Sequence, residues 1–292
     1  MLYSDYNYYT SNDNITYSID MIRLKCELTF NKYDNFVSFV KTCYLDCIDK
    51  NYVSFGIGDF KYNYTIKTDE GNSFWFGFIA NSELINNKKS LSNDKNKYNF
   101  TVEFNPNKIN LDDKILSKLL KLSSNWTIKS VDIAIDLKIN ILDLCGFDKA
   151  RKKDIRTFCG SEPDDKTVYM GRTDNRIKIY NKKRESKLDY DLTRIEISSK
   201  LDITFKELEY FQYDLKLPDL YLNNYMYSFS DYKDKTLLAQ LYAIQAGYPL
   251  NYLNRSYKEK IKNLLEVNGC KVNISNKDID YVLHKTINKI LA

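Results

Sequence analysis

Alternation of apolar and ionisable residues is the main pattern in the first two thirds of the chain. In Val131–Leu137 two aspartates oppose four aliphatic residues, and in Arg194–Ile197 an arginine and a glutamate oppose two isoleucines. Val102–Phe104 and Arg176–Tyr180 repeat this arrangement. Because side chains alternate along a strand, the pattern predicts strands with one apolar and one charged face.

Turn-forming residues join several of these strands into hairpins. The segments 62–67 and 74–79 flank a turn made of Asp, Glu, Gly and Asn, and the segments 166–170 and 176–180 flank a turn that begins with glycine. Further strands are predicted at 17–29, 98–104, 130–137 and 192–198.

Helical periodicity dominates the last third of the chain, with predicted helices at 234–245, 256–267 and 278–291. Earlier helices are predicted from Asp34, after Asn110 and around 142–151. We therefore expect an α+β fold, an antiparallel β-sheet core with helices packed on one face. The expected segments are a flexible tail (1–16), a core (17–204) and a helical C-terminal region (205–292).

The charge balance permits a nucleic-acid partner without requiring one. The chain has 44 Lys and Arg residues against 39 Asp and Glu, for a net charge of +5. No apolar run approaches the roughly 20 residues that cross a bilayer. We expect a cytoplasmic protein with no membrane partner.

If the alternating strands share one sheet, their ionisable side chains converge on its open face. Carboxylate oxygens gathered there would suit Mg²⁺ or Mn²⁺, and a neighbouring tyrosine would be a candidate nucleophile. An antiparallel sheet with one solvated face shows the same alternation, and the chain has 25 tyrosines, so the pattern alone leaves both interpretations open. The residues concerned are Glu103, Asp132, Asp136, Tyr180, Arg194 and Glu196.

Four segments carry a more specific resemblance. They are Val102–Lys108, Val131–Asp136, Tyr169–Glu185 and Arg194–Ile197, in that order and spacing. The chain resembles the Rep-trans type replication initiators of rolling-circle plasmids, a class best known from staphylococcal resistance plasmids. The resemblance extends from about residue 17 to residue 291 and is strongest between 98 and 200.

The resemblance implies that Tyr180 attacks a phosphodiester at a hairpin in the plasmid origin. The products are a 5′-phosphotyrosine and a free 3′-OH that primes synthesis, and the ends are later rejoined. It makes 17–204 the nicking core and implies a metal set of Glu103, Asp132, Asp136 and Glu196. Ser198 departs from the family, since relatives often carry a second acid there.

A phenol has a pKa of about 10, so the attack calls for Mg²⁺ or Mn²⁺, and cations could assist at the phosphate. The cations expected to do so are Lys178, Lys182 and Arg194. The sole histidine, His284, cannot form the histidine pair of the commonest tyrosine nickases. Carboxylate ligation, and thus a nickase outside that class, is the remaining option.

Other basic residues are expected to contact DNA, although runs of charge often only face solvent. They are Arg172, Arg176, Lys183, Arg255 and Lys258. The resemblance further implies that 205–292 serves origin recognition and homodimerisation and that a host helicase is recruited. Two alternatives stay open: a conjugative relaxase with the same core, and a non-catalytic origin-binding protein.

Overall fold

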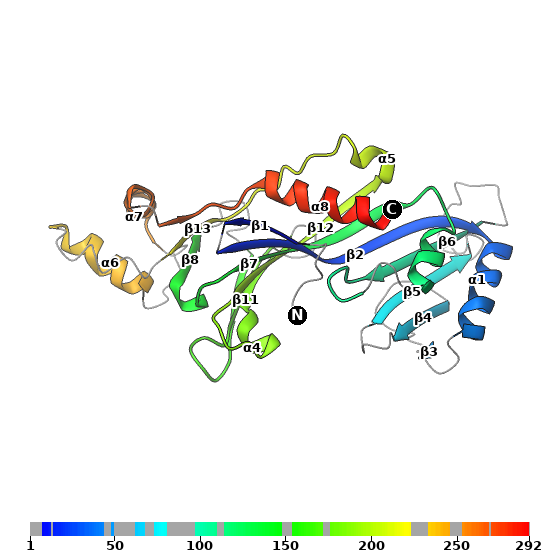
Figure 1. The fold of residues 1–292 in the computed structure, drawn as a ribbon. Helices are drawn as coiled ribbons and strands as arrows, with labels where there is room; N and C mark the ends of the chain where they lie inside the picture. The colour runs from blue at the N-terminus through cyan, green and yellow to red at the C-terminus, as the bar shows by residue number, and fades with distance from the viewer. Residues whose placement is uncertain are drawn as a thin grey trace.

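A computed structural model of the chain describes residues 8–12, 14–43, 48–49, 62–67, 73–80, 97–109, 114–147, 154–171, 176–222, 233–245, 253–268 and 270–291. Within these residues, 11 strands form one antiparallel sheet. Its order is β3–β4–β5–β6–β2–β7–β12–β11–β10–β9, with β1 paired to β2. Figure 1 shows the sheet as a long twisted ribbon with β2 and β7 running through its middle.

The strands of this sheet are β1 (Tyr8–Asn12), β2 (Ile15–Thr29), β3 (Ile48–Asp49), β4 (Tyr62–Lys67), β5 (Ser73–Ala80), β6 (Lys97–Phe104), β7 (Thr127–Leu137), β9 (Ile155–Cys159), β10 (Lys166–Met170), β11 (Arg176–Asn181) and β12 (Thr193–Thr204). A smaller sheet contains β8 (Leu144–Phe147), β13 (Asp219–Leu222) and β14 (Lys271–Val272). The helices are α1 (Phe30–Cys43), α3 (Lys114–Leu120), α4 (Lys182–Ser186), α5 (Phe205–Leu208), α6 (Lys235–Gln245), α7 (Arg255–Val267) and α8 (Asn276–Leu291), with a 3-10 turn η2 at Ile141–Asp143. None of these helices has both the length and the apolar character needed to cross a membrane.

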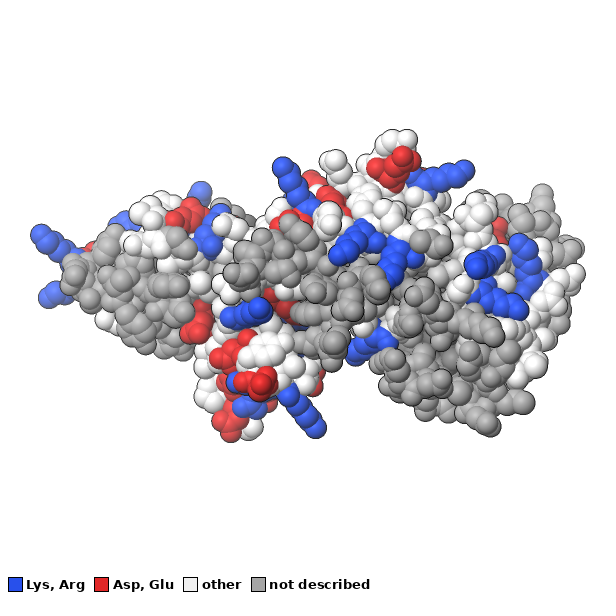
Figure 2. Space-filling model, viewed as in Figure 1, with Lys and Arg blue, Asp and Glu red and all other residues white. Residues whose placement is uncertain are grey.

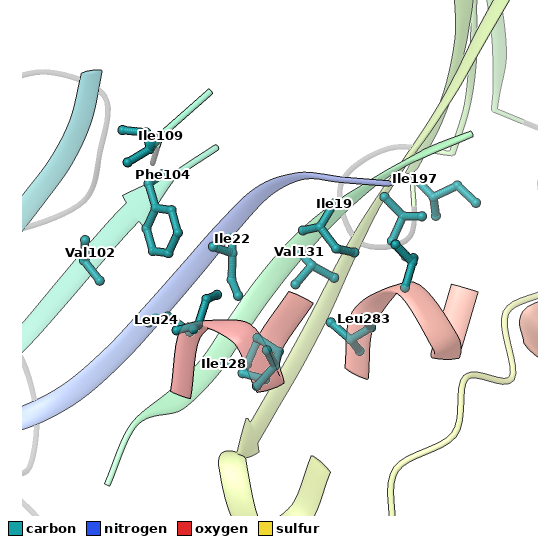
Figure 3. Packing of buried hydrophobic residues seen from close by; sticks show 14 of the residues in the cluster. Ile19, Ile22, Leu24, Val102, Phe104, Ile109, Ile128, Val131, Ile197 and Leu283 are labelled. Atoms are coloured by element: carbon teal, nitrogen blue, oxygen red, sulfur yellow. The ribbon is translucent and has the colours of Figure 1, made fainter. Parts of the chain in front are cut away.

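One face of the large sheet is apolar and is covered by helices. Ile19, Ile133 and Ile197 come from three neighbouring strands and are at most 1% exposed. Leu283 of α8 belongs to the same buried cluster, and Figure 3 shows it on their side of the sheet. Towards the other end, Phe36 of α1 packs edge-on against Phe76 of β5, and both belong to the same cluster. The predicted α+β fold with helices on one face is confirmed.

Strand β2 contains a β-bulge that changes its phase. Ile19 pairs with Ile133 of β7, whereas Met21 already pairs with Asp132, so Asp20 is the extra residue. Ile22, which strict alternation would place on the charged face, therefore points into the core and is fully buried.

A second, smaller core lies at one end of the molecule, where α6 and α7 pack beside the small sheet (Figure 1). Its buried residues include Tyr221 of β13, Leu241 of α6 and Ile261 of α7. Lys262 of α7 is 6% exposed and pairs with Asp219 of β13 at 2.6 Å. The chain then returns through β14 to α8, which packs on the large sheet.

Two expectations differ from the structure. Tyr8–Asn12 form β1, paired with β2, where a flexible tail was expected. Where a helix was expected around 142–151, η2 and β8 occupy 141–147 and residues 148–153 lie outside the described part. Pairing with β13 overrides the local pattern there, and Gly146 permits it, since a Cβ on Gly146 would come within 2.7 Å of the Leu220 side chain.

Candidate active site on the charged face of the sheet

The strongest sequence candidates lie on the sheet face opposite the helices. On this face of β12, Arg194 pairs with Asp136 of β7 on one side and with Tyr180 of β11 on the other. Two residues further along the same strand, Glu196 lies beside Lys178 of β11. The register of three antiparallel strands thus brings the predicted nucleophile, cations and carboxylates into adjacent rows.

Tyr180 lies among ionisable groups and is only 6% exposed. Its hydroxyl donates a long hydrogen bond of 3.4 Å to Oε2 of Glu196. The Lys178 ammonium lies 4.0 Å from the centre of the tyrosine ring, and that of Lys182 lies 5.9 Å away. Burial raises the pKa of Tyr180; the charge of Arg194 opposes this rise and that of Glu196 adds to it.

Helix α4 holds the end of the Tyr180 strand in place. Asn181 is its N-cap, and the Asn181 side chain accepts a hydrogen bond from the backbone N–H of Arg184. The amide of Asn181 donates to Asp164 in the β9–β10 turn at 2.9 Å, and Nε of Arg184 donates to the same carboxylate at 2.9 Å. Lys182, at the start of α4, is buried and pairs with Glu185.

Arg194 and Asp136 form a buried, two-pronged ion pair. Nε and Nη2 of Arg194 each donate to one carboxylate oxygen of Asp136 at 2.7 Å, and the two side chains are 2% and 1% exposed. Nη1 of Arg194 also lies 3.2 Å from Oδ1 of Asp20. Both carboxylate oxygens of Asp136 are therefore engaged by the Arg194 guanidinium.

The remaining carboxylates are mutually close enough to shift one another. Desolvation raises the pKa of Asp132; Ser198 lowers it through a hydrogen bond, and the charges of Asp20 and Glu103 raise it further. Desolvation likewise raises the pKa of Glu196, with Lys178 opposing and Asp132 adding to the rise. Like charges held together in a partly buried place are a common property of sites that bind cations.

The donor set fits a hard divalent cation in its chemistry. Glu103, Asp132 and Glu196 carry oxygen donors on the same face of the sheet, and Glu103 forms an ion pair with Arg23. Within the described residues, no three acidic, histidine or cysteine side chains are arranged as a metal cluster. The carboxylates share one face of the sheet, and the charge of Asp20 contributes to the raised pKa of both Asp132 and Glu196.

Asp20 is a site residue that the sequence analysis missed. Its carboxylate contacts Arg194 and accepts a hydrogen bond of 3.0 Å from the Asn105 amide, in the turn after β6. The sequence contains an indication of this position, since the apolar residues of β2 change from odd numbers up to Ile19 to even numbers from Ile22. Such a break in alternation predicts a bulge, and bulges often redirect a side chain into a site.

The predicted DNA-contacting residues do not form one group. Arg176 shares the charged face with Tyr180, and Lys183 pairs with Asp191 at 2.9 Å. Arg255 and Lys258 lie on α7, which packs beside the small sheet, whereas Tyr180 lies on β11 of the large sheet (Figure 1). Arg172 lies outside the described residues. Figure 2 shows acidic and basic side chains intermingled on the protrusion that carries α4, with no single-sign patch there.

Comparisons with known proteins place part of this chain beside replication initiators. No family model matches the chain. A replication initiation protein of Staphylococcus aureus is 35% identical over 136 residues, which is 40% of this chain and 43% of that protein. A second one from the same organism is 32% identical over 136 residues, with the same coverage. The chain thus spans less than half the length of the curated relatives it matches.

Among solved structures, the rolling circle replication initiator protein from Geobacillus stearothermophilus aligns with 64% of this chain and 74% of its own length. The identity is 14% and the TM-score 0.34. The sequence similarities confirm the resemblance to replication initiation proteins that the motifs around Tyr180 indicate.

Proposed function

We propose that this protein initiates rolling-circle replication of a plasmid by binding its origin and nicking one strand through Tyr180. The observation that carries the proposal is the position of the Tyr180 hydroxyl, which donates to Glu196 on the charged face of the sheet. The similarity of part of the chain to replication initiation proteins supports the same assignment. Plasmid origin DNA, with a single-stranded or hairpin nick site, is then the principal partner.

In the proposed reaction the phenolic oxygen of Tyr180 attacks the scissile phosphorus. The new Tyr–O–P bond replaces the bond from phosphorus to the 3′ oxygen, so the products are a 5′-phosphotyrosine and a 3′-OH. Glu196 accepts the phenolic proton at Oε2, because this oxygen already receives the hydroxyl hydrogen bond, and its other oxygen is left for a cation. The departing 3′ oxygen takes up a proton from solvent, and the reverse steps rejoin the ends.

The cations of the site act at different points. Lys178 lies over the tyrosine ring and can reach a phosphate bound in front of the hydroxyl. Arg194 is buried and paired, so its charge acts by favouring the phenolate. Lys182 is held by Glu185 and is the more distant of the two lysines.

We further propose that Asp132, Glu196 and Glu103, with Asp20 beside them, hold Mg²⁺ or Mn²⁺. Their oxygen donors and the raised pKa values of Asp132 and Glu196 support this assignment. A cation there would polarise the scissile phosphate and stabilise the departing oxygen. Asp136 is assigned to positioning Arg194, because both its oxygens accept from the guanidinium.

The test uses supercoiled plasmid that bears the cognate origin. Wild-type protein with Mn²⁺ should yield relaxed DNA with protein covalently attached, and EDTA should abolish it. Tyr180→Phe should bind the origin without forming the adduct. Tyr210→Phe, at a tyrosine that is 83% exposed and follows α5, is the matched control and should nick normally.

Three other results would change the assignment. An adduct that persists in Tyr180→Phe would remove Tyr180 from the nucleophile role. Origin binding without nicking by the wild type would favour the non-catalytic origin-binding protein. A conjugative relaxase shares the chemistry and would be distinguished by failure of the nicked origin to support replication. Homodimerisation and helicase recruitment are proposals that follow from the family resemblance.

A further inference from the structure

We infer that Phe158 and Tyr169 form a stacking platform for the bases of single-stranded DNA next to the nicked phosphate. This inference rests on the proposed function and adds a binding surface to it. The surface comprises the outward side chains of β9 and β10, on the face that carries Tyr180.

The strand register places the platform directly beside Tyr180. Phe158 of β9 pairs with Thr167 of β10, which pairs with Tyr180 of β11. In the next row, Tyr169 of β10 lies beside Lys178 of β11. Neighbouring strands lie about 4.8 Å apart, so Phe158 is about 10 Å from the Tyr180 backbone and within a few nucleotides of the attacked phosphate.

The two aromatic rings are placed for contact with a partner. Phe158 is 58% exposed on the edge strand of the sheet, and Tyr169 is half-buried. Their rings meet edge to face, with centroids 5.6 Å apart and an interplanar angle of 89°. Neither ring belongs to the two buried cores. An exposed phenylalanine braced by a second aromatic ring is a surface on which a base can stack.

Cations alternate with the rings on the same face. The guanidinium of Arg176 lies 5.6 Å from the centre of the Tyr169 ring, and Arg156 is the neighbour of Tyr169 on the edge strand. Lys178 likewise lies over the Tyr180 ring. The paired residues of β9, β10 and β11 thus offer aromatic rings on which bases can stack and positive charges that can contact phosphates. Single-stranded DNA is the polymer that presents both at short intervals, whereas duplex DNA keeps its bases stacked inside.

A second copy of the chain is the rival occupant, because β9 is an edge strand. Pairing of two edges would use the backbone of β9 and would leave side chains on the sheet face uncovered. The exposed ring and the cations both lie on that face, which favours a nucleic acid. Size-exclusion chromatography of the variants below separates the two occupants.

The experiment measures fluorescence anisotropy of a labelled mixed-sequence single-stranded oligonucleotide and of its duplex. Phe158→Ala should weaken single-strand binding about tenfold, the order expected for one lost base–aromatic stack, and leave duplex binding unchanged. Phe158→Trp should retain the affinity, whereas Phe158→Leu should lose it, since leucine keeps apolar area without a π-face. Tyr210→Ala, a matched loss of an exposed ring outside β9, β10 and β11, should bind as the wild type does.

Three outcomes would overturn the platform: unchanged single-strand binding by Phe158→Ala, full affinity in Phe158→Leu, or a change of oligomeric state in Phe158→Ala. Thermal unfolding of each variant confirms that the protein remains folded, and Phe158→Trp provides the readout if alanine disrupts β9. If the wild type nicks the origin and Phe158→Ala binds single strands normally, only this inference is overturned. Wild-type protein that neither nicks nor binds overturns the proposed function itself.

Discussion

At the scale of single residues, Arg194 is a buried charge, and the stability of the folded protein depends on its ion pair with Asp136. Asp136→Ala would leave the guanidinium buried, with the more distant Asp20 as its remaining ion-pair partner among the described residues. We expect this variant to lose about 3–5 kcal/mol of unfolding free energy in chemical denaturation. Asp191→Ala removes the exposed partner of Lys183 and should cost less than about 1 kcal/mol. Equal losses of unfolding free energy in the two variants would show that the buried ion pair contributes no more to stability than the exposed one.

Asp132 should show a conflict between stability and activity. Its pKa is raised in the folded protein by desolvation, so its favourable contribution is full at low pH and is lost as the pH rises through the folded pKa. At neutral pH the carboxylate therefore opposes folding. We expect Asp132→Asn to raise the thermal midpoint while lowering the nicking rate by about two orders of magnitude.

Glu207 supplies the opposite case for comparison. Its pKa is lowered by hydrogen bonds from the backbone and side chain of Thr204, in the capping box of α5. Its contribution is present above the unfolded pKa and is lost as the pH falls. Glu207→Gln should therefore lower the thermal midpoint at neutral pH and leave nicking unchanged. A fall in stability of Asp132→Asn comparable to that of Glu207→Gln would contradict the strain assigned to Asp132.

A site residue could be predicted where its position depends on its neighbours in sequence, and could not where it depends on strand register or on a bulge. Alternation placed Glu196 and Asp132 on the charged faces of their own strands, because it depends only on neighbours in sequence; the pairing of β7, β12 and β11 brings these faces together with that of Tyr180. The partner of Asp136 could not be predicted, since it depends on the register of β7 against β12. Asp20 was missed because its position requires a bulge that strict alternation does not include.

At the scale of elements, strands with one apolar face were the easiest to predict. The hairpin of β10 and β11 follows from two alternating segments around a glycine turn, where Gly171 adopts φ 86°. β8 and β9 were not predicted. β8 exists through its pairing with β13, which is distant in sequence, and β9 is an edge strand whose outer residues are exposed. Neither long-range pairing nor exposure on both faces produces a regular alternation of apolar and polar residues in the sequence.

Helix α8 should contribute to stability chiefly through its buried face. Leu283 is fully buried against the apolar side of the sheet, whereas Leu291, at the end of the same helix, is 54% exposed. We expect Leu283→Ala to lose about 2–5 kcal/mol of unfolding free energy through lost burial and a cavity. Leu291→Ala, the same chemical change, should lose less than about 0.5 kcal/mol. Similar losses in urea denaturation would mean that α8 does not cover the sheet in solution.

At the scale of the whole molecule, the chain builds most of the large core, then the small core, and completes the large core with its last helix. Residues 223–269, which include α6 and α7, leave the small sheet after β13 and return to it at β14. The last helix then completes the core of the large sheet. A fragment that ends at Thr204 would therefore lose α8 and expose the apolar face of the central strands.

We expect that residues 223–269 can be replaced by a short turn without unfolding the large sheet. β13 and β14 are already antiparallel neighbours, with Tyr221 opposite Lys271, so a hairpin can join them. This variant should keep a cooperative thermal transition, whereas the fragment ending at Thr204 should not. Circular dichroism during heating makes the comparison. A folded Thr204 fragment would show instead that the nicking core is autonomous.

The bulge at Asp20 also suggests a deletion. Without Met21, β2 would run in unbroken alternation, with Ile19 and Ile22 two positions apart and both still turned inward. The shortened chain could thus fold with its interior intact, while the carboxylate beside Arg194 would lose its present placement. We expect normal thermal unfolding together with impaired nicking. The extra residue of β2 would then be needed for the reaction and not for the stability of the fold.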